Sequence, residues 1–380
     1  SHVSNKLGAA RSLLDLMDGL SQKGVKCYVI MPSDGPLAEE LKKRGIVYSI
    51  VPFKLWVSFP DSPRWKRLLR LGFNLLATIR VAVKAKAWGA HILYSNSSVT
   101  PVGAFAAFLL GKPHIWHVRE FGREDYDLAF DFGEKWSLRL MEKLSFRIIV
   151  ISEALRQRYM RYISPHKVQT VYDAVNLGKS RPCGMRRGQD GAERKKIPIL
   201  VIAGLLHEGK GQLDAVLAVG ELLKRNLEVK LKIVGNGDRR YLERLKRTVA
   251  QNDIERYVDF MGFVDDITSV MGSADAVLVC SRSEAFGRVT VEGMFCGKPV
   301  IGARSGATPE LIKEGFNGLL YNPGDPRDLA AKIRYLLEHP KEAKQMGANG
   351  QRWASEKFTV ERCAEQVYNV LQEAIQAKGK

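Results

Sequence analysis

The sequence predicts an α/β protein built from two doubly wound parallel sheets. Short apolar segments alternate with amphipathic segments along the chain, which is the order of parallel strands joined by helices. The length of 380 residues is enough for about two domains of roughly 150 residues each. We therefore expect two similar α/β units with a cleft between them, in which ligands would bind at the carboxyl ends of the strands.

The expected elements follow this alternation in both halves. In the first half, the apolar segments predict strands at 25–31, 46–51, 91–94, 114–118 and 147–151. In the second half, they predict strands at 197–203, 229–234, 258–261, 276–280 and 299–302, with helices at 212–225, 240–251 and 288–296.

The domain boundary is expected where apolar residues give way to glycines and charges, at 178–196. This predicts one domain at 1–177, a linker at 178–196 and a second domain at 197–357. The last segment, 358–380, carries an apolar stripe that must be buried, and we expect it to cross back as a helix and pack on the first domain.

Composition excludes a disordered or fibrous chain, because hydrophobic residues make up 45% and charged residues 26%. The five cysteines lie far apart, which argues against a zinc ribbon or a disulfide scaffold and favours a reducing, cytoplasmic location. The longest apolar run, 102–110, is about half the ~20 residues of a membrane-spanning helix. No secretory signal is recognised, and residues 1–4 read as the end of a strand whose beginning is missing.

The net charge of +18 is unevenly distributed, because residues 1–180 hold 27 basic and 15 acidic residues, or +12. Such a basic half indicates an anionic partner: phosphates, nucleic acid or a membrane surface. Residues 62–90 contain seven basic residues and no acidic one. The apolar residues of this segment recur at helical spacing, so we expect a helix that packs its apolar stripe on the first domain and can turn its basic face to an anionic membrane. No nucleic-acid-binding motif is recognised, so no nucleic acid partner is expected.

The most specific stretch is 281–301, where Glu284 lies in a loop after a strand, Gly287 at a turn and Glu292 just inside a helix. Free N–H groups at a helix start attract phosphate. A loop carboxylate can accept hydrogen bonds from sugar hydroxyls, and a second one a turn into the helix can bind a ribose diol. Taken singly, Glu284 is read as an ordinary loop residue and Glu292 as a solvated helix residue.

The full stretch resembles the E-x7-E signature of the retaining glycosyltransferases of family 4, which have the GT-B fold. Blocks at 233–238, 260–266, 306–312 and 315–321 follow the same family in order and spacing. The resemblance implies two Rossmann-like domains that face each other across a cleft. It implies transfer of a hexose from a nucleoside diphosphate sugar (UDP or GDP) with retention of configuration, and no cofactor or metal. It further implies an acceptor held by the first domain, lipid-linked or otherwise anionic, in glycan or cell-envelope polysaccharide assembly on the inner face of the cytoplasmic membrane.

The resemblance also implies roles for single residues. Glu284 would orient the donor sugar, His117 would face that sugar from the first domain, and Glu120 would touch the acceptor. Lys210 would neutralise the diphosphate, a task that suits a lysine as a point charge. The implied donor-binding residues are Gly8, Lys210, Gly235, Gly262, Phe263, Val264, Phe286, Gly287 and Glu292.

Three features leave alternatives open. Leu205 stands where the family often has an arginine, and Arg282 or Arg288 could supply that charge. Asp125 and Asp127 form a D-x-D, the manganese signature of the other large glycosyltransferase fold, but they lie in a charged run and are read as loop. Other functions remain in competition: a GT-B epimerase, a glycogen-synthase-like polymerase, or a basic nucleic-acid-binding protein with salt-dependent affinity.

Overall fold

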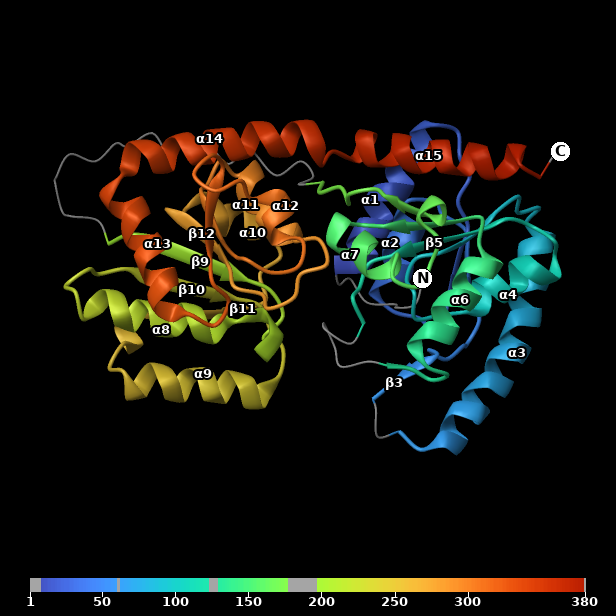
Figure 1. The fold of residues 1–380 in the computed structure, drawn as a ribbon, viewed down its shortest axis with the longest axis horizontal. Helices are drawn as coiled ribbons and strands as arrows, with labels where there is room; N and C mark the ends of the chain where they lie inside the picture. The colour runs from blue at the N-terminus through green and yellow to red at the C-terminus, as the bar shows by residue number, and fades with distance from the viewer. Residues whose placement is uncertain (1–7, 60–61, 123–128, 177–196, 379–380) are drawn as a thin grey trace. The chain divides into compact units, whose positions relative to one another are not determined.

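The computed structural model describes residues 8–59, 62–122, 129–176 and 197–378. The chain divides into two compact units (Figure 1). Unit 1 comprises Ser1–Ala174 together with Thr359–Lys380, and unit 2 comprises Val175–Phe358. The expected linker and the D-x-D of Asp125 and Asp127 lie outside the described residues.

Unit 2 is built on one parallel sheet of six strands in the order β11-β10-β9-β12-β13-β14. The strands are β9 (Ile199–Ala203), β10 (Lys230–Val234), β11 (Val258–Gly262), β12 (Ala276–Val279), β13 (Val300–Ala303) and β14 (Gly318–Tyr321). Five of them lie where the apolar segments predict strands, and β14 was not expected. From β9 the chain runs outward through β10 and β11 and then returns to β12 on the other side of β9. The sheet order therefore reverses between β9 and β12, which is where doubly wound sheets bind ligands.

Helices cover both faces of this sheet because strand side chains alternate between faces. Leu278 belongs to the core formed with α8 (Gln212–Leu223), α9 (Arg239–Gln251) and α13 (Pro326–Glu338). The next residue back, Val277, faces the other way and lies against Gly293 of α11 (Arg288–Phe295). The remaining helices of the unit are α10 (Ile267–Gly272), α12 (Thr308–Leu311) and α14 (Pro340–Lys357).

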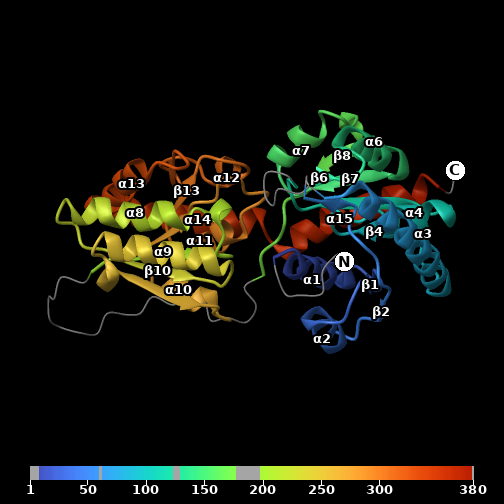
Figure 2. The same cartoon turned by 90° about the horizontal axis from the view of Figure 1, so that it is seen from below.

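Unit 1 contains a parallel four-stranded sheet in the order β4-β5-β7-β8, a parallel pair β1-β2 and an antiparallel pair β3-β6. The strands are β1 (Val29–Met31), β2 (Tyr48–Ile50), β3 (Val57–Ser58), β4 (Leu93–Ser95), β5 (His114–Val118), β6 (Ala129–Phe130), β7 (Arg147–Val150) and β8 (Val168–Thr170). The helices are α1 (Gly8–Gln22), α2 (Pro36–Lys43), α3 (Arg64–Ala87), α4 (Val102–Leu109), α6 (Glu134–Leu144) and α7 (Glu153–Tyr159). Figure 2 shows α1 and α2 beside the β1-β2 pair, and all three share one apolar core.

The C-terminal helix α15 (Val360–Gln376) belongs to unit 1, where it packs on α1. Its buried stripe of Cys363, Ala364 and Val367 shares a core with Leu16 and Leu20 of α1. The two helices approach closely, because a Cβ atom on Gly19 would lie 2.6 Å from the Cβ atom of Ala364. The apolar stripe of the last segment is thus buried on unit 1.

The packing expected for residues 62–90 is wrong. These residues form the single long helix α3, but the apolar residues expected to pack on the sheet point to solvent. The buried face consists of smaller residues instead: Asn74, Ala77, Thr78, Val81, Ala82 and Ala85. Both faces of α3 are apolar, and only small side chains let the helix lie close against α4, with which it shares a core. The sequence pattern could not tell which face is the inner one.

Among the described residues, no helix is long and apolar enough to cross a lipid bilayer. In the part of the chain that the structure describes, Cys27, Cys280, Cys296 and Cys363 form no disulfide.

Candidate functional site

A lysine and a glutamate meet at the carboxyl edge of the unit 2 sheet. Lys210 ends the short 3-10 helix η2 (Glu208–Lys210) after β9, and Glu284 lies in the loop after β12. The Nζ atom of Lys210 lies 2.9 Å from Oε2 of Glu284. Their side chains are 32% and 18% exposed, so the pair is partly open to solvent. The structure therefore places two of the predicted site residues in direct contact at the point where the strand order reverses.

The position of Glu284 is fixed by main-chain hydrogen bonds around it. The Arg282 N–H donates to the Gly209 carbonyl at 2.8 Å, which ties the β12 loop to the β9 loop. The Ala307 N–H donates to the Glu284 carbonyl at 2.8 Å, which ties it to the β13 loop. The main chain of the β12 loop is therefore held on both sides of the site, at Arg282 and at Glu284.

Glu292 lies on α11, which begins after Gly287. Gly287 has a φ of 105°, a conformation that favours glycine, and this turn starts the helix beside Glu284. Glu292 is only 8% exposed, and its Oε1 lies 3.7 Å from Nε of Arg288. No hydrogen bond to this carboxylate is found among the described residues. A nearly buried carboxylate with unused acceptor capacity can bind a diol.

The ring of Phe286 is turned away from this edge. It is buried, and it packs against Phe358 in an edge-to-face arrangement with 5.6 Å between centroids. The ring of Phe286 therefore has no part at this edge, and the role expected for its N–H group stays a prediction.

The ends of β9, β10 and β11 come together without side chains between them. Gly235 follows β10 with a φ of 132°, and a Cβ atom there would lie 1.9 Å from the Gly204 carbonyl oxygen. The Gly235 N–H donates to the Gly262 carbonyl at 2.7 Å. Beyond Gly262, Phe263 is 61% exposed and Val264 is half-buried. An exposed aromatic ring beside a glycine-lined edge can stack on a flat ligand group.

The arginine that the family often places at Leu205 has two possible substitutes, and they differ in environment. Leu205 is itself exposed. Arg288 is mostly buried and ion-paired with Glu292, whereas the Arg282 side chain is exposed in the β12 loop. Arg282 is therefore the more accessible cation at this edge.

His117 of β5 is fully buried in unit 1. Its Nδ1 atom contacts the hydroxyl of Tyr94 and lies 3.2 Å from Nη2 of Arg119, while its Nε2 atom has no hydrogen-bond partner among the described residues. Burial, together with the Arg119 charge, lowers the pKa of His117 well below its usual value. The imidazole is therefore uncharged at neutral pH, and its Nε2 atom lies 4.0 Å from Oδ1 of Asp173.

Arg119 is the centre of a network that the sequence reasoning missed. Its guanidinium forms a buried ion pair with Asp173 and donates from Nε to Oδ1 of Asn96 at 2.7 Å. Asn96 donates in turn to the Ala9 carbonyl at 3.3 Å, next to Gly8 at the start of α1. Arg119 thus links the ends of three strands to the first turn of α1. β-Branched and aromatic residues predominate over 168–173, a composition typical of a strand that could have pointed to Asp173. This segment was not recognised as a strand from the sequence.

Glu120 is almost fully engaged in positioning its own surroundings. Its Oε1 accepts hydrogen bonds from the Ser97 hydroxyl at 2.7 Å and from the N–H and hydroxyl of Ser98 at 2.6 Å each. The carboxylate therefore holds the loop after β4 in place, and its acceptor sites are largely occupied.

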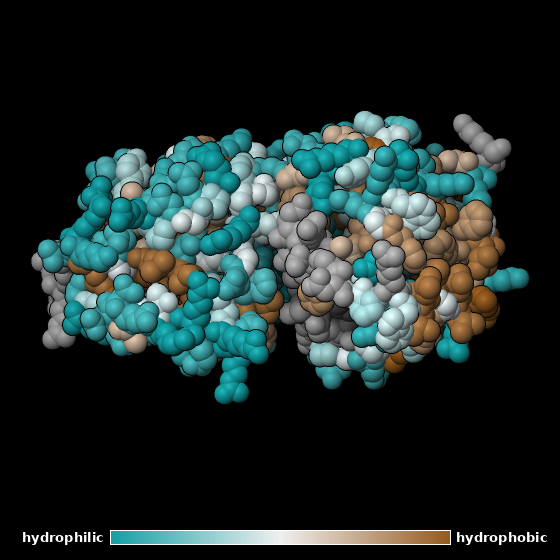
Figure 3. Space-filling view, turned by 60° about the horizontal axis from the view of Figure 1, so that its bottom comes forward, coloured by the Kyte–Doolittle hydropathy of each residue, from teal (hydrophilic) through white to brown (hydrophobic). Residues whose placement is uncertain are grey.

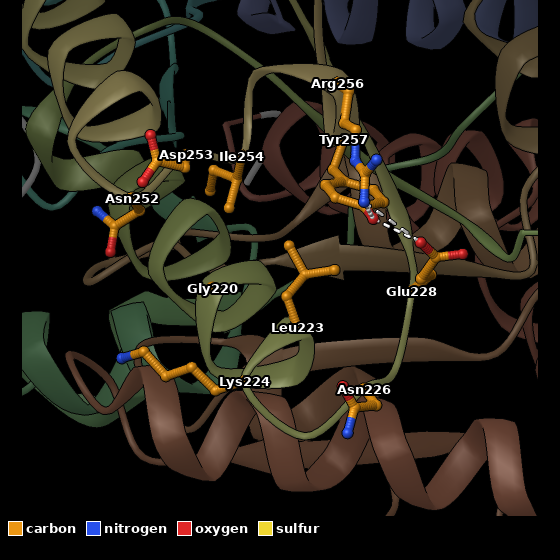
Figure 4. A pocket seen from close by; sticks show the side chains of 10 residues that line it. All are labelled: Gly220, Leu223, Lys224, Asn226, Glu228, Asn252, Asp253, Ile254, Arg256 and Tyr257. Atoms are coloured by element: carbon orange, nitrogen blue, oxygen red, sulfur yellow. Dashed lines mark hydrogen bonds and ion pairs between the residues drawn. The ribbon is translucent and has the colours of Figure 1, made fainter.

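A separate pocket of about 480 Å³ lies at the opposite edge of the unit 2 sheet (Figure 4). Glu228 and Arg256 line it just before β10 and β11 begin, and Tyr257 donates to Glu228 at 2.5 Å. None of the predicted site residues lines this pocket. It lies at the amino ends of the strands, whereas doubly wound sheets bind ligands at the carboxyl ends.

Comparison with protein families identifies the class of protein to which this chain belongs. Residues 7–179 match the profile of "Glycosyltransferase Family 4", and residues 187–353 match "Glycosyl transferases group 1". The chain belongs to these glycosyltransferases. The two matches fall on unit 1 and unit 2 respectively, so both halves of this glycosyltransferase are recognised independently.

Individual relatives agree with this family. The chain is 34% identical to one uncharacterized glycosyltransferase of Methanocaldococcus jannaschii, over 39% of this chain and 42% of the relative. It is 27% identical to a second one from the same organism, over 98% of this chain and 96% of the relative. Among solved structures, Anabaena HepE in complex with UDP-glucose is 23% identical, covers 98% of both chains and gives a TM-score of 0.78. This likeness shows that the glycosyltransferase has the GT-B fold, with two Rossmann-like domains.

Proposed function

We propose that this glycosyltransferase moves a hexose from a nucleoside diphosphate sugar (UDP- or GDP-linked) to an anionic or lipid-linked acceptor, with retention of configuration and without a metal ion. The reaction would serve glycan or cell-envelope polysaccharide assembly. The observation that carries the proposal is the Lys210–Glu284 pair at the carboxyl edge of β9 and β12, with Glu292 on the helix that follows.

The proposed donor site divides the work among these three side chains. Lys210 exchanges its bond to Glu284 for the diphosphate and stabilises the charge that develops on the leaving group. Glu284, released from Lys210 and held by its main chain, accepts hydrogen bonds from the sugar hydroxyls. Glu292 uses its free acceptor capacity for the ribose diol, and the exposed ring of Phe263 stacks on the base.

A related protein supports the donor class. The Anabaena protein of the same fold binds UDP-glucose in its crystal structure. By analogy we infer a nucleotide sugar as the donor of this chain. In unit 1, we propose Gly8 at the start of α1 as the group near the donor phosphate and the neutral His117 as the group that meets the sugar. Glu120 remains a candidate for the acceptor, at least through the loop that it holds.

The acceptor class rests on charge. Unit 1 contains most of the first 180 residues, which supply +12 of the net charge. A basic surface around an acceptor site favours a phosphate- or pyrophosphate-bearing acceptor, including one carried by a membrane lipid. We accordingly propose peripheral association with an anionic membrane surface.

Turnover with a panel of UDP- and GDP-sugars tests the proposal. Release of the nucleoside diphosphate is expected with one sugar nucleotide and should persist in excess EDTA, and proton NMR of the product should show the anomeric configuration of the donor. Inversion of configuration would contradict the retaining mechanism, and loss of activity in EDTA would contradict metal independence. No turnover of any nucleotide sugar, with or without lipid-linked acceptors, would overturn the proposed function.

A further inference from the structure

We infer that the outward apolar face of α3, together with the end of α4, inserts into an anionic lipid layer and holds unit 1 on it. This "α3 apolar surface" consists of Trp65, Leu68, Leu69, Leu75, Leu76, Ile79 and Val83 of α3, and Phe108 and Leu109 of α4. The inference rests on the proposed function for its membrane-bound acceptor, and it specifies how the protein would be held there.

The spacing and exposure of these residues define a continuous apolar surface. Within 65–69 and within 75–83 the seven α3 residues recur three or four positions apart, and each is between 54% and 64% exposed. Phe108 and Leu109 add two more exposed side chains on α4, which shares a buried core with α3. Figure 3 shows hydrophobic residues gathered on this part of unit 1. A patch of this extent on a protein surface marks an interaction site.

The exposed face is not the result of a loosely attached helix. Arg70 donates from Nε and Nη2 to the two carboxylate oxygens of the buried Asp131, at 2.9 and 2.6 Å. Arg67 donates to the Asp131 main-chain carbonyl at 3.2 Å, and Asn74 exchanges hydrogen bonds with the main chain of Lys54. These bonds fix the rotation of α3 about its own axis, and in this orientation its apolar face points to solvent.

Charge complementarity identifies the occupant as an anionic lipid surface. Lys66, Arg80, Lys84 and Lys86 are exposed on α3, and residues 62–90 include no acidic side chain. Cations that flank an apolar helix face can reach lipid phosphates while the apolar side chains enter the acyl region. A second copy of this chain fits less well, because a two-fold contact would place this basic helix against itself.

Insertion differs measurably from adsorption by charge alone. Electrostatic attraction to lipid phosphates is screened by salt, whereas burial of apolar side chains in the acyl region is not. Because Arg67 and Arg70 are already bound to Asp131, their removal should weaken the fold of unit 1 rather than report on lipid contact. The apolar residues are therefore the ones to change.

Co-sedimentation of the full chain with vesicles of phosphatidylglycerol and phosphatidylcholine, at 0.1 and 0.5 M NaCl, tests the inference. We expect wild-type binding to anionic vesicles that weakens with salt but keeps a salt-resistant part. The variant L69Q/L76Q/V83Q should lose at least tenfold in vesicle partitioning. The control V47Q/I50Q/F316Q changes three apolar residues outside this surface, which are 43% to 49% exposed, and should bind as wild type. Equal losses in both variants, or wild-type binding abolished at 0.5 M NaCl, would overturn insertion.

Trp65 offers an independent readout, because its ring lies on the surface at the start of α3. Brominated acyl chains should quench the tryptophan fluorescence of the bound wild type and quench W65F markedly less. Sedimentation velocity without lipid distinguishes the alternative occupant: a wild-type dimer that L69Q/L76Q/V83Q converts to a monomer would show a protein interface and overturn the inference.

Turnover of the nucleotide sugar in the absence of vesicles keeps the two proposals separate. The variant L69Q/L76Q/V83Q should transfer the donor sugar to a water-soluble acceptor, or hydrolyse the nucleotide sugar, at the wild-type rate. Vesicle binding without any nucleotide-sugar turnover would support the lipid-binding surface and overturn the proposed function. Turnover without vesicle binding would support the proposed function and overturn the lipid-binding surface.

Discussion

Lys210 and Glu284 are 74 positions apart in sequence, yet their charged groups are 2.9 Å apart at the carboxyl edge of neighbouring strands β9 and β12. The pair is only partly buried, so a ligand can reach both the cation and the anion. A diphosphate can take the lysine while the glutamate turns to sugar hydroxyls. The predictions below follow from this exchange and from the packing around it.

Lys210→Ala is expected to weaken the binding of the nucleoside diphosphate by about 10- to 100-fold, because a charge-assisted hydrogen bond is worth roughly 1.5–3 kcal/mol. Isothermal titration calorimetry measures this affinity. The matched control Lys246→Ala removes an exposed lysine of α9 and should leave the affinity unchanged. Equal affinity of Lys210→Ala and wild type would remove Lys210 from the site.

Glu284→Gln should act on turnover rather than on folding. The main chain of Glu284 is held by the Ala307 N–H, so the melting temperature should stay within a few degrees of wild type. The value of kcat/KM should fall by about 100-fold, as for the loss of a contact that matters most in the transition state. A variant with near-normal kcat/KM would contradict the role of Glu284.

Glu292→Ala should abolish the preference for a ligand that carries the ribose 2′- and 3′-hydroxyls over one that lacks them. The wild type is expected to bind the ribonucleoside diphosphate at least tenfold more tightly than its 2′,3′-dideoxy analogue, because the nearly buried carboxylate would otherwise have no hydrogen-bond donor. The variant should bind both ligands with the same, weaker affinity. Discrimination that survives in Glu292→Ala would place the ribose elsewhere.

Gly235→Ala should destabilise unit 2 by roughly 2–4 kcal/mol, because its Cβ atom would overlap the Gly204 carbonyl oxygen at a positive φ. Gly24→Ala is the control, since Gly24 has a φ of 77° with open space around it and should cost only about 1 kcal/mol. Urea unfolding measures both. Similar small losses in the two variants would show that the β9 and β10 ends are not this close.

Buried neutral histidines make the stability of unit 1 depend on pH. Burial lowers the pKa of His114 to about 3, against a usual value of 6.5. Below pH 6.5 His114 becomes protonated in the unfolded chain but stays neutral in the folded chain. The free energy of unfolding therefore decreases as the pH falls. At pH 5 the His114 contribution amounts to about 2 kcal/mol.

Urea unfolding of wild type and His114→Asn at pH 7.5 and 5.0 checks this dependence. The variant should lose less stability than wild type between the two pH values, whereas His91→Asn, which removes an exposed histidine, should behave as wild type. The buried His117 should retain part of the pH dependence in the His114 variant, because its pKa is lowered too. An unchanged slope in His114→Asn would show that His114 is accessible to protons in the folded protein.

Most strands of the parallel sheets and the donor motif could be predicted from sequence because they rest on local patterns. β5 and α11 follow apolar periodicity closely, and Glu284, Gly287 and Glu292 lie within one short segment. The Arg119–Asp173 pair was missed, because it joins residues 54 positions apart and Asp173 follows a strand, β8, that is only three residues long. The outward direction of α3 was missed for another reason: with two apolar faces, the choice depends on how closely α4 can approach, which only the packed structure shows.

Hydrogen–deuterium exchange with and without the nucleoside diphosphate sugar that supports turnover tests the central claim most directly. The account predicts protection of peptides covering 204–211, 262–266 and 281–292, which form the carboxyl edge of the unit 2 sheet, and no change at 224–228 and 252–257. Protection confined to 224–228 and 252–257, where the pocket of Figure 4 lies, or no protection in unit 2 at all, would contradict it.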